Sequence, residues 1–128
     1  CSKMNKTHKV SPLGKTWIFD LDGTLVKHNG YKIDGEDSWL EGALEYLRQI
    51  PKQDMIVFLT SRTKKEKDLT ESFLAKYNVR YDAIIYGAGY GERILVNDCK
   101  PSGLRTALAV NTQRDRFMED EFEIDETL

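Results

Sequence analysis

Polar residues that suit phosphoryl-transfer chemistry directly follow three short apolar runs of this sequence. The residues after the three runs are Asp20 and Asp22, then Thr60, Ser61 and Arg62, and finally Asn97, Asp98 and Lys100. A single Asp or Thr in such a position is most often a turn residue or a helix cap. Three groups in the same position relative to their runs indicate instead that these side chains share one site.

The acidic members of this set predict a bound cation. Asp20, Asp22 and Asp98 would repel one another strongly if they lay close together, so the cluster would need a positive ion. Oxygen ligands with room for water suit Mg²⁺. A carboxylate that attacks phosphorus forms an aspartyl-phosphate, and Thr60 or Ser61 together with a Lys would hold the phosphoryl oxygens. The expected chemistry is magnesium-dependent phosphoryl transfer.

The elements that would position these residues are strands alternating with helices. Strand-like runs occupy residues 16–20, 55–59, 83–86, 94–96 and 106–110, and helical spacing of apolar residues occupies 40–47 and 64–77. This alternation predicts a parallel sheet with helices on both faces. The uninterrupted apolar run 55–59 favours a strand that is covered on both sides. Ligands bind beyond the carboxyl ends of such strands, where the polar residues stand.

Three segments carry a resemblance to a known family. Phe19-Asp20-Leu21-Asp22-Gly23-Thr24-Leu25 resembles the first motif of the haloacid dehalogenase (HAD) superfamily. Leu59-Thr60-Ser61-Arg62 is similar to the second motif, and Val96-Asn97-Asp98 is similar to the fourth. The resemblance implies a three-layer, Rossmann-like α/β core and a phosphatase that works through an aspartyl-phosphate.

The resemblance also implies roles for individual residues. Asp20 would attack phosphorus and bind Mg²⁺, Asp22 would act as general acid and base and also bind the metal, and Asp98 would be a further metal ligand. Thr60 would hold the phosphoryl group. The residues expected to support or bind the phosphate beside them are Gly23, Thr24, Ser61 and Arg62.

The third and fourth motifs depart from the family pattern. The family uses a Lys before the fourth motif, and residues 81–92 contain none. We expect Lys100 to supply this cation, with Arg62 and Arg93 as alternatives. Asn97 stands where many members of the family have a second acidic residue, which would lower the negative charge at the metal.

The spacing of the motifs leaves no room for a large cap domain. The stretches on either side of Thr60 are filled by the expected helices, loop and strand, so the chain resembles an uncapped member. Such members form a homo-oligomer that completes the site or act on larger, exposed phosphorylated groups. Residues 97–111 resemble HAD proteins associated with bacterial surface-polysaccharide synthesis. A small phosphorylated metabolite such as a sugar or polyol phosphate is therefore the leading expected substrate.

Composition bounds the remaining interpretations. The 128 residues carry a net charge of −2, with 40% hydrophobic and 31% charged residues, which fits one globular domain and argues against nucleic acid as a partner. No apolar run is long enough for a membrane span. Two cysteines make no disulfide framework, so the expected compartment is the cytoplasm. We expect a flexible lead-in at residues 1–13, a catalytic domain at 14–118 and an acidic tail at 119–128.

Three other functions use similar residues. A phosphorelay receiver domain also places carboxylates, Thr or Ser and Lys on a parallel sheet, but its phosphorylated Asp lies mid-chain, and here Thr60 ends the middle run. A nucleic-acid 3′-end phosphatase would share the uncapped core but would need a basic groove. A catalytically silent metal-binding scaffold or assembly partner would explain the irregular third and fourth motifs.

Overall fold

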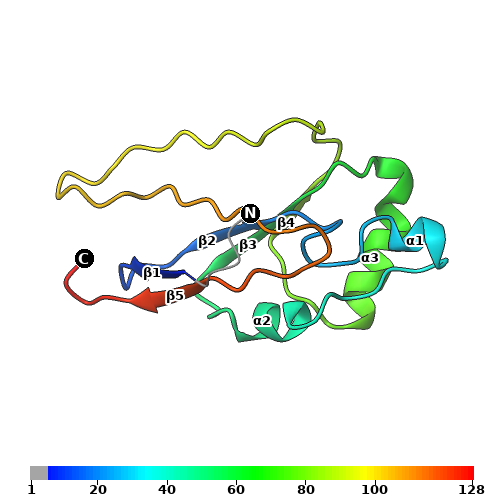
Figure 1. The fold of residues 1–128 in the computed structure, drawn as a ribbon, viewed down its shortest axis with the longest axis horizontal. Coiled ribbons are helices and arrows are strands. Elements are labelled where there is room, and N and C mark those ends of the chain that lie inside the picture. Colours follow the sequence, from blue (N-terminus) through cyan, green and yellow to red (C-terminus); the bar gives the residue numbers. More distant parts are fainter. Residues whose placement is uncertain (1–5) are drawn as a thin grey trace.

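The computed structural model describes residues 6–128 and shows a small α/β fold built around parallel strands (Figure 1). The strands are β1 (Thr7–Val10), β2 (Thr16–Phe19), β3 (Met55–Leu59), β4 (Ala83–Ile85) and β5 (Glu121–Ile124). The helices are α1 (Gly30–Ile33), α2 (Ala43–Gln49), the 3₁₀ turn η1 (Lys64–Glu66) and α3 (Lys67–Lys76). The predicted alternation of strands and helices is therefore present up to β4.

The main sheet has the strand order β2-β3-β4, and both pairings are parallel. Ile18 pairs with Val57, which in turn pairs with Ala83. Because the strands point the same way, the residues after β2 and after β3 lie at one edge of the sheet. Within residues 6–128, β2 pairs on one side only, so its other edge is free.

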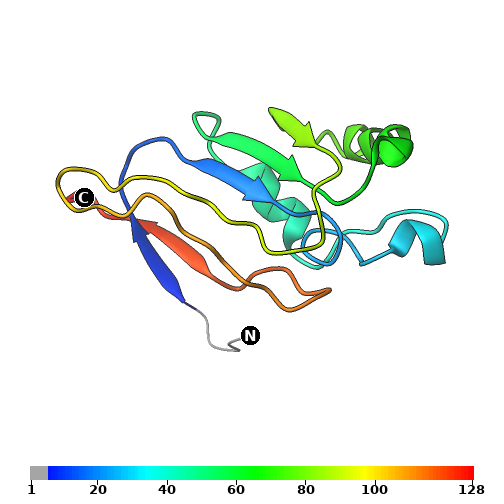
Figure 2. The ribbon, with the colours of Figure 1, turned by 90° about the horizontal axis from the view of Figure 1, so that it is seen from above.

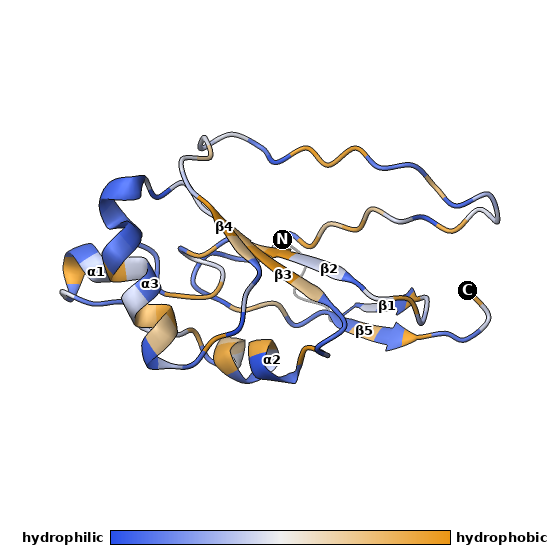
Figure 3. Ribbon diagram, turned by 180° about the vertical axis from the view of Figure 1, so that it is seen from behind, coloured by the Kyte–Doolittle hydropathy of each residue, from blue (hydrophilic) through white to orange (hydrophobic). Residues whose placement is uncertain are grey.

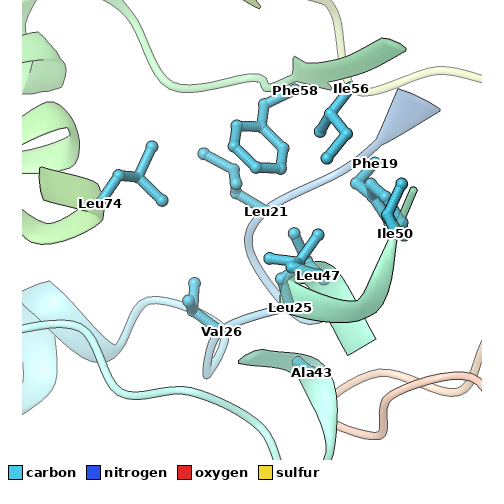
Figure 4. Close-up of a cluster of buried hydrophobic side chains, with 10 residues drawn as sticks. All are labelled: Phe19, Leu21, Leu25, Val26, Ala43, Leu47, Ile50, Ile56, Phe58 and Leu74. Carbon is cyan, nitrogen blue, oxygen red and sulfur yellow. The ribbon is translucent and has the colours of Figure 1, made fainter. Parts of the chain in front are cut away.

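The core lies between the sheet and the helices α2 and α3 (Figure 4). Phe19, Ile56 and Phe58 point from the strands towards Leu47 of α2 and Leu74 of α3. The buried members of this cluster are Phe19, Leu21, Leu25, Val26, Ala43, Leu47, Ile50, Ile56, Phe58 and Leu74. Full burial of each large side chain stabilises the fold by about 1.5–3 kcal/mol.

The second face of the sheet differs from the prediction. Ile18, Met55 and Ile85 are about half exposed, whereas the alternate residues of the same strands are buried or partly buried. Both α2 and α3 contribute to the one cluster that covers the buried face. In the described part of the chain, helices therefore cover one face, and the expectation of helices on both faces was wrong.

A long segment without regular structure replaces the two last predicted strands. Residues 94–96 and 106–110 are not strands; they belong to an extended arm, residues 87–113, that leaves the sheet after β4 and folds back on itself (Figures 1 and 2). Every residue from 89 to 103 is exposed. Apolar composition alone predicted strands here, but the structure offers these residues no neighbouring strand within the described chain.

The two ends of the described chain form a second, two-stranded sheet. β1 pairs in parallel with β5, with Thr7 opposite Glu121 and Val10 opposite Ile124. Nε2 of His8 donates to Oδ2 of Asp120 at 2.7 Å, and the His8 ring stacks on Phe122. Residues 7–10 of the expected lead-in and residues 121–124 of the expected acidic tail are thus strands. Residues 1–5 of the expected lead-in lie outside the described residues.

Within residues 6–128, no helix has the length and apolar character needed to cross a membrane.

Candidate functional site

A tight loop carries the first candidate residues away from β2. The carbonyl of Leu21 accepts hydrogen bonds from the backbone N–H groups of Thr24, Leu25 and Val26 at 3.2, 2.9 and 3.1 Å. Leu21 and Leu25 anchor the loop because both side chains are buried in the core. Gly23 has a φ of 81°, a conformation that favours glycine. The loop therefore fixes Asp20 and Asp22 at the carboxyl end of β2.

Asp20 is the most accessible carboxylate of this loop. Its Oδ2 accepts a hydrogen bond from the Thr24 hydroxyl at 3.2 Å, and its Oδ1 lies 3.7 Å from Nη1 of Arg93. About a third of the side chain, 35%, is exposed. Partial burial raises the pKa of Asp20, against the lowering effects of Arg93 and of its hydrogen bonds. A carboxylate that is desolvated yet reachable suits a nucleophile.

Asp22 is engaged in a buried ion-pair network. Nε and Nη2 of Arg62 donate to its two carboxylate oxygens, both at 2.9 Å. The same guanidinium donates to Asp37 at 3.0 and 2.8 Å and to the Thr70 hydroxyl at 2.9 Å. The Arg62 and Asp37 side chains are each only 2% exposed.

The charge of Arg62 is fixed by these partners. Burial lowers the pKa of Arg62, but the hydrogen bonds and charges of Asp22 and Asp37 outweigh that effect and raise it above its usual value. The ring of Tyr31 also lies against the guanidinium, with its centroid 4.4 Å from Cζ. Arg62 thus holds the loop to α3 and to the segment before α2, and its donors are occupied by protein groups.

The residues directly after β3 form the second part of the candidate site. Thr60 is fully buried, its N–H donates to the carbonyl of Ile85 at 2.9 Å, and its hydroxyl oxygen accepts from the N–H of Arg62 at 3.0 Å. The Ser61 hydroxyl donates to the carbonyl of Gly89 at 3.3 Å and accepts from Nη2 of Arg93 at 3.3 Å. Arg93 therefore bridges Ser61 and Asp20.

Two predicted site residues do not join the others. Asp98 and Lys100 belong to the exposed stretch 89–103 of the arm, and the arm extends away from the carboxyl end of β2 (Figure 1). The Lys100 N–H and carbonyl close the turn at the tip, and the carbonyl of Asp98 accepts a hydrogen bond from the Thr106 hydroxyl. Arg93, an alternative for the third-motif cation, is the basic residue that reaches Asp20.

The donor set of one chain does not fit Mg²⁺. Among residues 6–128, no three His, Cys, Asp or Glu side chains come close enough together to hold a metal ion. Asp22 is paired with Arg62, which leaves Asp20 as the carboxylate that could accept a cation. The expected third ligand, Asp98, is on the arm.

Sequence reasoning did not find Asp37, Tyr31 or Thr70. Their partner Arg62 follows the apolar run 55–59 and could be recognised as a candidate site residue. Nothing in the local pattern marks Asp37 as a second carboxylate paired with it. Asp115 was also missed: its Oδ1 accepts from the N–H of His28 at 2.7 Å, and its N–H donates to the carbonyl of Gly23 at 2.8 Å. These two hydrogen bonds join the segment just after the arm to the Asp20 loop.

The fold is similar to that of a chain in the solved structure of the Pnkp1/Rnl/Hen1 complex. The TM-score is 0.51 and the sequence identity 27%, over 66% of this chain and 32% of that chain. This chain thus spans about a third of the length of the solved chain it matches. No protein-family model matches the chain, and no curated protein matches it. The likeness supports a shared small α/β core with parallel strands.

Proposed function

We propose that this chain hydrolyses phosphomonoesters with Asp20 as the nucleophile. The observation that carries the proposal is the setting of the Asp20 carboxylate: it stands at the carboxyl end of β2, partly desolvated, with the Thr24 hydroxyl on one oxygen and Arg93 beside the other. Attack by an Asp20 oxygen on phosphorus forms an acyl phosphate and releases the alcohol of the substrate. Water then cleaves the acyl phosphate and releases inorganic phosphate.

The groups around Asp20 suit an anionic substrate. Arg93 is about a third exposed, and its guanidinium contacts both Asp20 and Ser61. A cation in this position would stabilise the charge on the transferring phosphoryl oxygens. Ser61 and Thr24 supply further hydroxyl groups at the same edge.

The proposed role of Asp22 as general acid and base has a structural requirement. Both of its carboxylate oxygens accept hydrogen bonds from Arg62. The side chain is 20% exposed, so it borders the site. Proton transfer by Asp22 would require one of these hydrogen bonds to open, because an ion-paired carboxylate is a weak base.

Magnesium remains a proposed cofactor. Mg²⁺ is usually bound through one or two carboxylates together with water and substrate phosphate. In the described residues both carboxylates of the loop face an arginine, Asp20 beside Arg93 and Asp22 paired with Arg62, so this arrangement does not fit the metal.

A small phosphorylated metabolite, such as a sugar or polyol phosphate, is the first candidate substrate. The second is a nucleic-acid 3′ end, which is favoured by one observation: Asp20 is open to solvent, so a phosphate on a large molecule could reach it. The overall charge of −2 argues against a strongly basic surface for nucleic acid. The likeness to the Pnkp1/Rnl/Hen1 chain supports the core and does not choose between these substrates.

The test is phosphate release from sugar, polyol and nucleotide phosphates and from 3′-phosphorylated oligonucleotides, with Mg²⁺ and with a chelator. We expect Asp20→Asn to lower the rate by at least about 1,000-fold, because the nucleophile is gone. The matched control is Asp68→Asn on α3, which removes an exposed carboxylate away from the site. Turnover by Asp20→Asn at the wild-type rate would exclude the mechanism. Absence of turnover with every substrate would favour the silent-scaffold alternative.

A further inference from the structure

A β-turn just after the arm contains a residue in an uncommon backbone conformation. Residues 113–116, Gln-Arg-Asp-Arg, form a strongly hydrophilic stretch (Figure 3), and the N–H of Arg116 donates to the carbonyl of Gln113 at 3.0 Å. Asp115, the third residue of this turn, has a φ of 64°, in the left-handed region that favours glycine. Other residues hold such a conformation where surrounding contacts enforce it, and such residues gather at functional sites.

Two hydrogen bonds of Asp115 hold this turn on the Asp20 loop. The N–H of Asp115 donates to the carbonyl of Gly23 at 2.8 Å, and its Oδ1 accepts from the N–H of His28 at 2.7 Å. The contact is close: a Cβ at Gly23 would lie 3.2 Å from Cγ of Arg114 and 3.8 Å from Nδ1 of His28. The stem of Arg114 therefore lies against the backbone of the loop that carries the proposed nucleophile.

The guanidinium of Arg114 is not engaged by the protein. In the part of the chain that the structure describes, it makes no hydrogen bond and no ion pair, and the residue is exposed. Arg93 differs, because it lies 3.7 Å from Asp20 and its charge lowers the pKa of that carboxyl, whereas Arg114 has no such effect. The Arg114 guanidinium therefore lies farther from the nucleophile than the Arg93 guanidinium does, although its stem borders the same loop.

We propose that Arg114 binds a second phosphate group of the substrate, distinct from the phosphoryl group that Asp20 receives. This inference rests on the proposed phosphatase function. A free guanidinium presents its N–H donors in a planar fork that matches the oxygens of a phosphate. The His28 ring, which lies against the same glycine, borders the same place. The substrate class is therefore a small bisphosphorylated compound rather than a simple monophosphate.

The two arginines would bind different parts of such a substrate. Arg93 contacts Asp20 and Ser61, so it faces the phosphoryl group that reacts. Arg114 lies on the Gly23 side of the loop, so it faces a group of the substrate that does not react. A contact to a group that does not react is the same before and during the reaction. Its loss raises KM and leaves kcat unchanged, which separates a binding residue from a residue that acts on the transferring phosphoryl.

The kinetic test compares esters that differ by one phosphate: fructose 1-phosphate with fructose 1,6-bisphosphate, and adenosine 3′-phosphate with adenosine 3′,5′-bisphosphate. The pair that is turned over better distinguishes a sugar from a nucleotide. In that pair, Arg114→Ala should raise KM for the bisphosphate about 10- to 100-fold and leave its kcat and both constants of the monophosphate unchanged. The matched control, Arg116→Ala, removes the same charge from the same turn and should change neither substrate. A fall in kcat for the monophosphate, or equal effects of the two variants, would overturn the proposal.

Binding without turnover separates this proposal from the proposed function. In an Asp20→Asn background, isothermal titration with the two bisphosphates measures Kd directly. Arg114→Ala should weaken binding about 10- to 100-fold, Arg114→Lys less, because it keeps the charge but loses the planar fork, and Arg116→Ala not at all. No binding of either bisphosphate, or equal Kd values for the Arg114 and Arg116 variants, would overturn the proposal. Wild-type protein that binds a bisphosphate through Arg114 but releases no phosphate would remove the proposed function alone and leave the anion site standing.

Discussion

Asp22 and Arg62, forty positions apart, form a bidentate ion pair with both N–O distances at 2.9 Å. The pair joins the loop after β2 to the segment that follows β3. Since Asp37 and Thr70 occupy the remaining donors of Arg62, one buried guanidinium also holds the segment before α2 and α3 itself.

Loss of Arg62 should destabilise the protein strongly. Arg62→Met leaves the buried Asp37 and the largely buried Asp22 without their counter-charge. We expect a loss of about 3–5 kcal/mol in the free energy of unfolding. Urea denaturation followed by circular dichroism measures it. Arg48→Met, which removes an exposed guanidinium with one hydrogen bond to the Tyr77 carbonyl, should cost less than about 1.5 kcal/mol. Equal losses would show that the network does not stabilise the fold.

The ionised Asp20 carboxylate should lower the free energy of unfolding at a pH above its raised pKa. Burial raises its pKa above 3.8 in the folded state, so the folded protein holds this proton more tightly than the unfolded chain does. Its contribution to stability is therefore complete below pH 3.8 and is lost as the pH rises through the raised value. We expect Asp20→Asn to be more stable than wild type at pH 7, by a small amount because the side chain is 35% exposed and solvent screens its charge.

The pH dependence separates this effect from packing. Thermal unfolding of Asp20→Asn and wild type at several pH values should show a difference that shrinks towards pH 4. A difference that grew on acidification would contradict the direction of the pKa shift.

Arg93 should matter for turnover, because its guanidinium lies 3.7 Å from the Asp20 carboxylate. Arg93→Ala should lower the rate by about 100-fold or more, as expected for loss of a group that stabilises the transferring phosphoryl. Lys76→Ala, on the exposed side of α3, should leave the rate unchanged. Steady-state phosphate release measures both. Similar rates for the two variants would remove Arg93 from the site.

Phe58 should be the costliest apolar position of β3. The side chain is fully buried and packs at tilted angles against Phe19 and Tyr81. Phe58→Ala should cost about 3–5 kcal/mol, because it leaves a cavity between the sheet and α3. Ile85→Ala, at a half-exposed position of β4, should cost clearly less in the same chemical denaturation experiment. A smaller loss for Phe58 than for Ile85 would place the core on the other face.

The sequence predicted the elements whose apolar residues are buried within the chain. Residues 16–19 and 55–59 form β2 and β3, residues 83–85 form β4, and the stripe over 64–77 forms η1 and α3. In each case the side chains that set the pattern pack into one cluster. The sequence likewise placed Asp20 and Asp22 directly after the first apolar run, where the loop that carries them begins.

Other elements were beyond sequence reasoning for identifiable reasons. β1 (Thr-His-Lys-Val) contains one aliphatic residue and β5 is only four residues long, and the two pair over a long sequence separation, so neither has a strong local signal. Residues 94–96 have the apolar composition of a strand, but composition does not tell which edge a strand pairs with. The position of Asp98 depends on that pairing. The order of the candidate motifs along the chain could therefore be predicted, but the separation of Asp98 from Asp20 could not.

The pairing of β1 with β5 also constrains how the chain folds. His8 and Asp120 are 112 positions apart, so the small sheet forms only after nearly all of the described chain is available. Contacts of such high sequence separation slow folding, because a long loop must close before they form. β1 is synthesised well before β5, and the ring contact between Trp17 and Phe122 can form only once β5 is present. The backbone hydrogen bonds of the Asp20 loop lie within residues 21–26 and can therefore form before β1 and β5 meet.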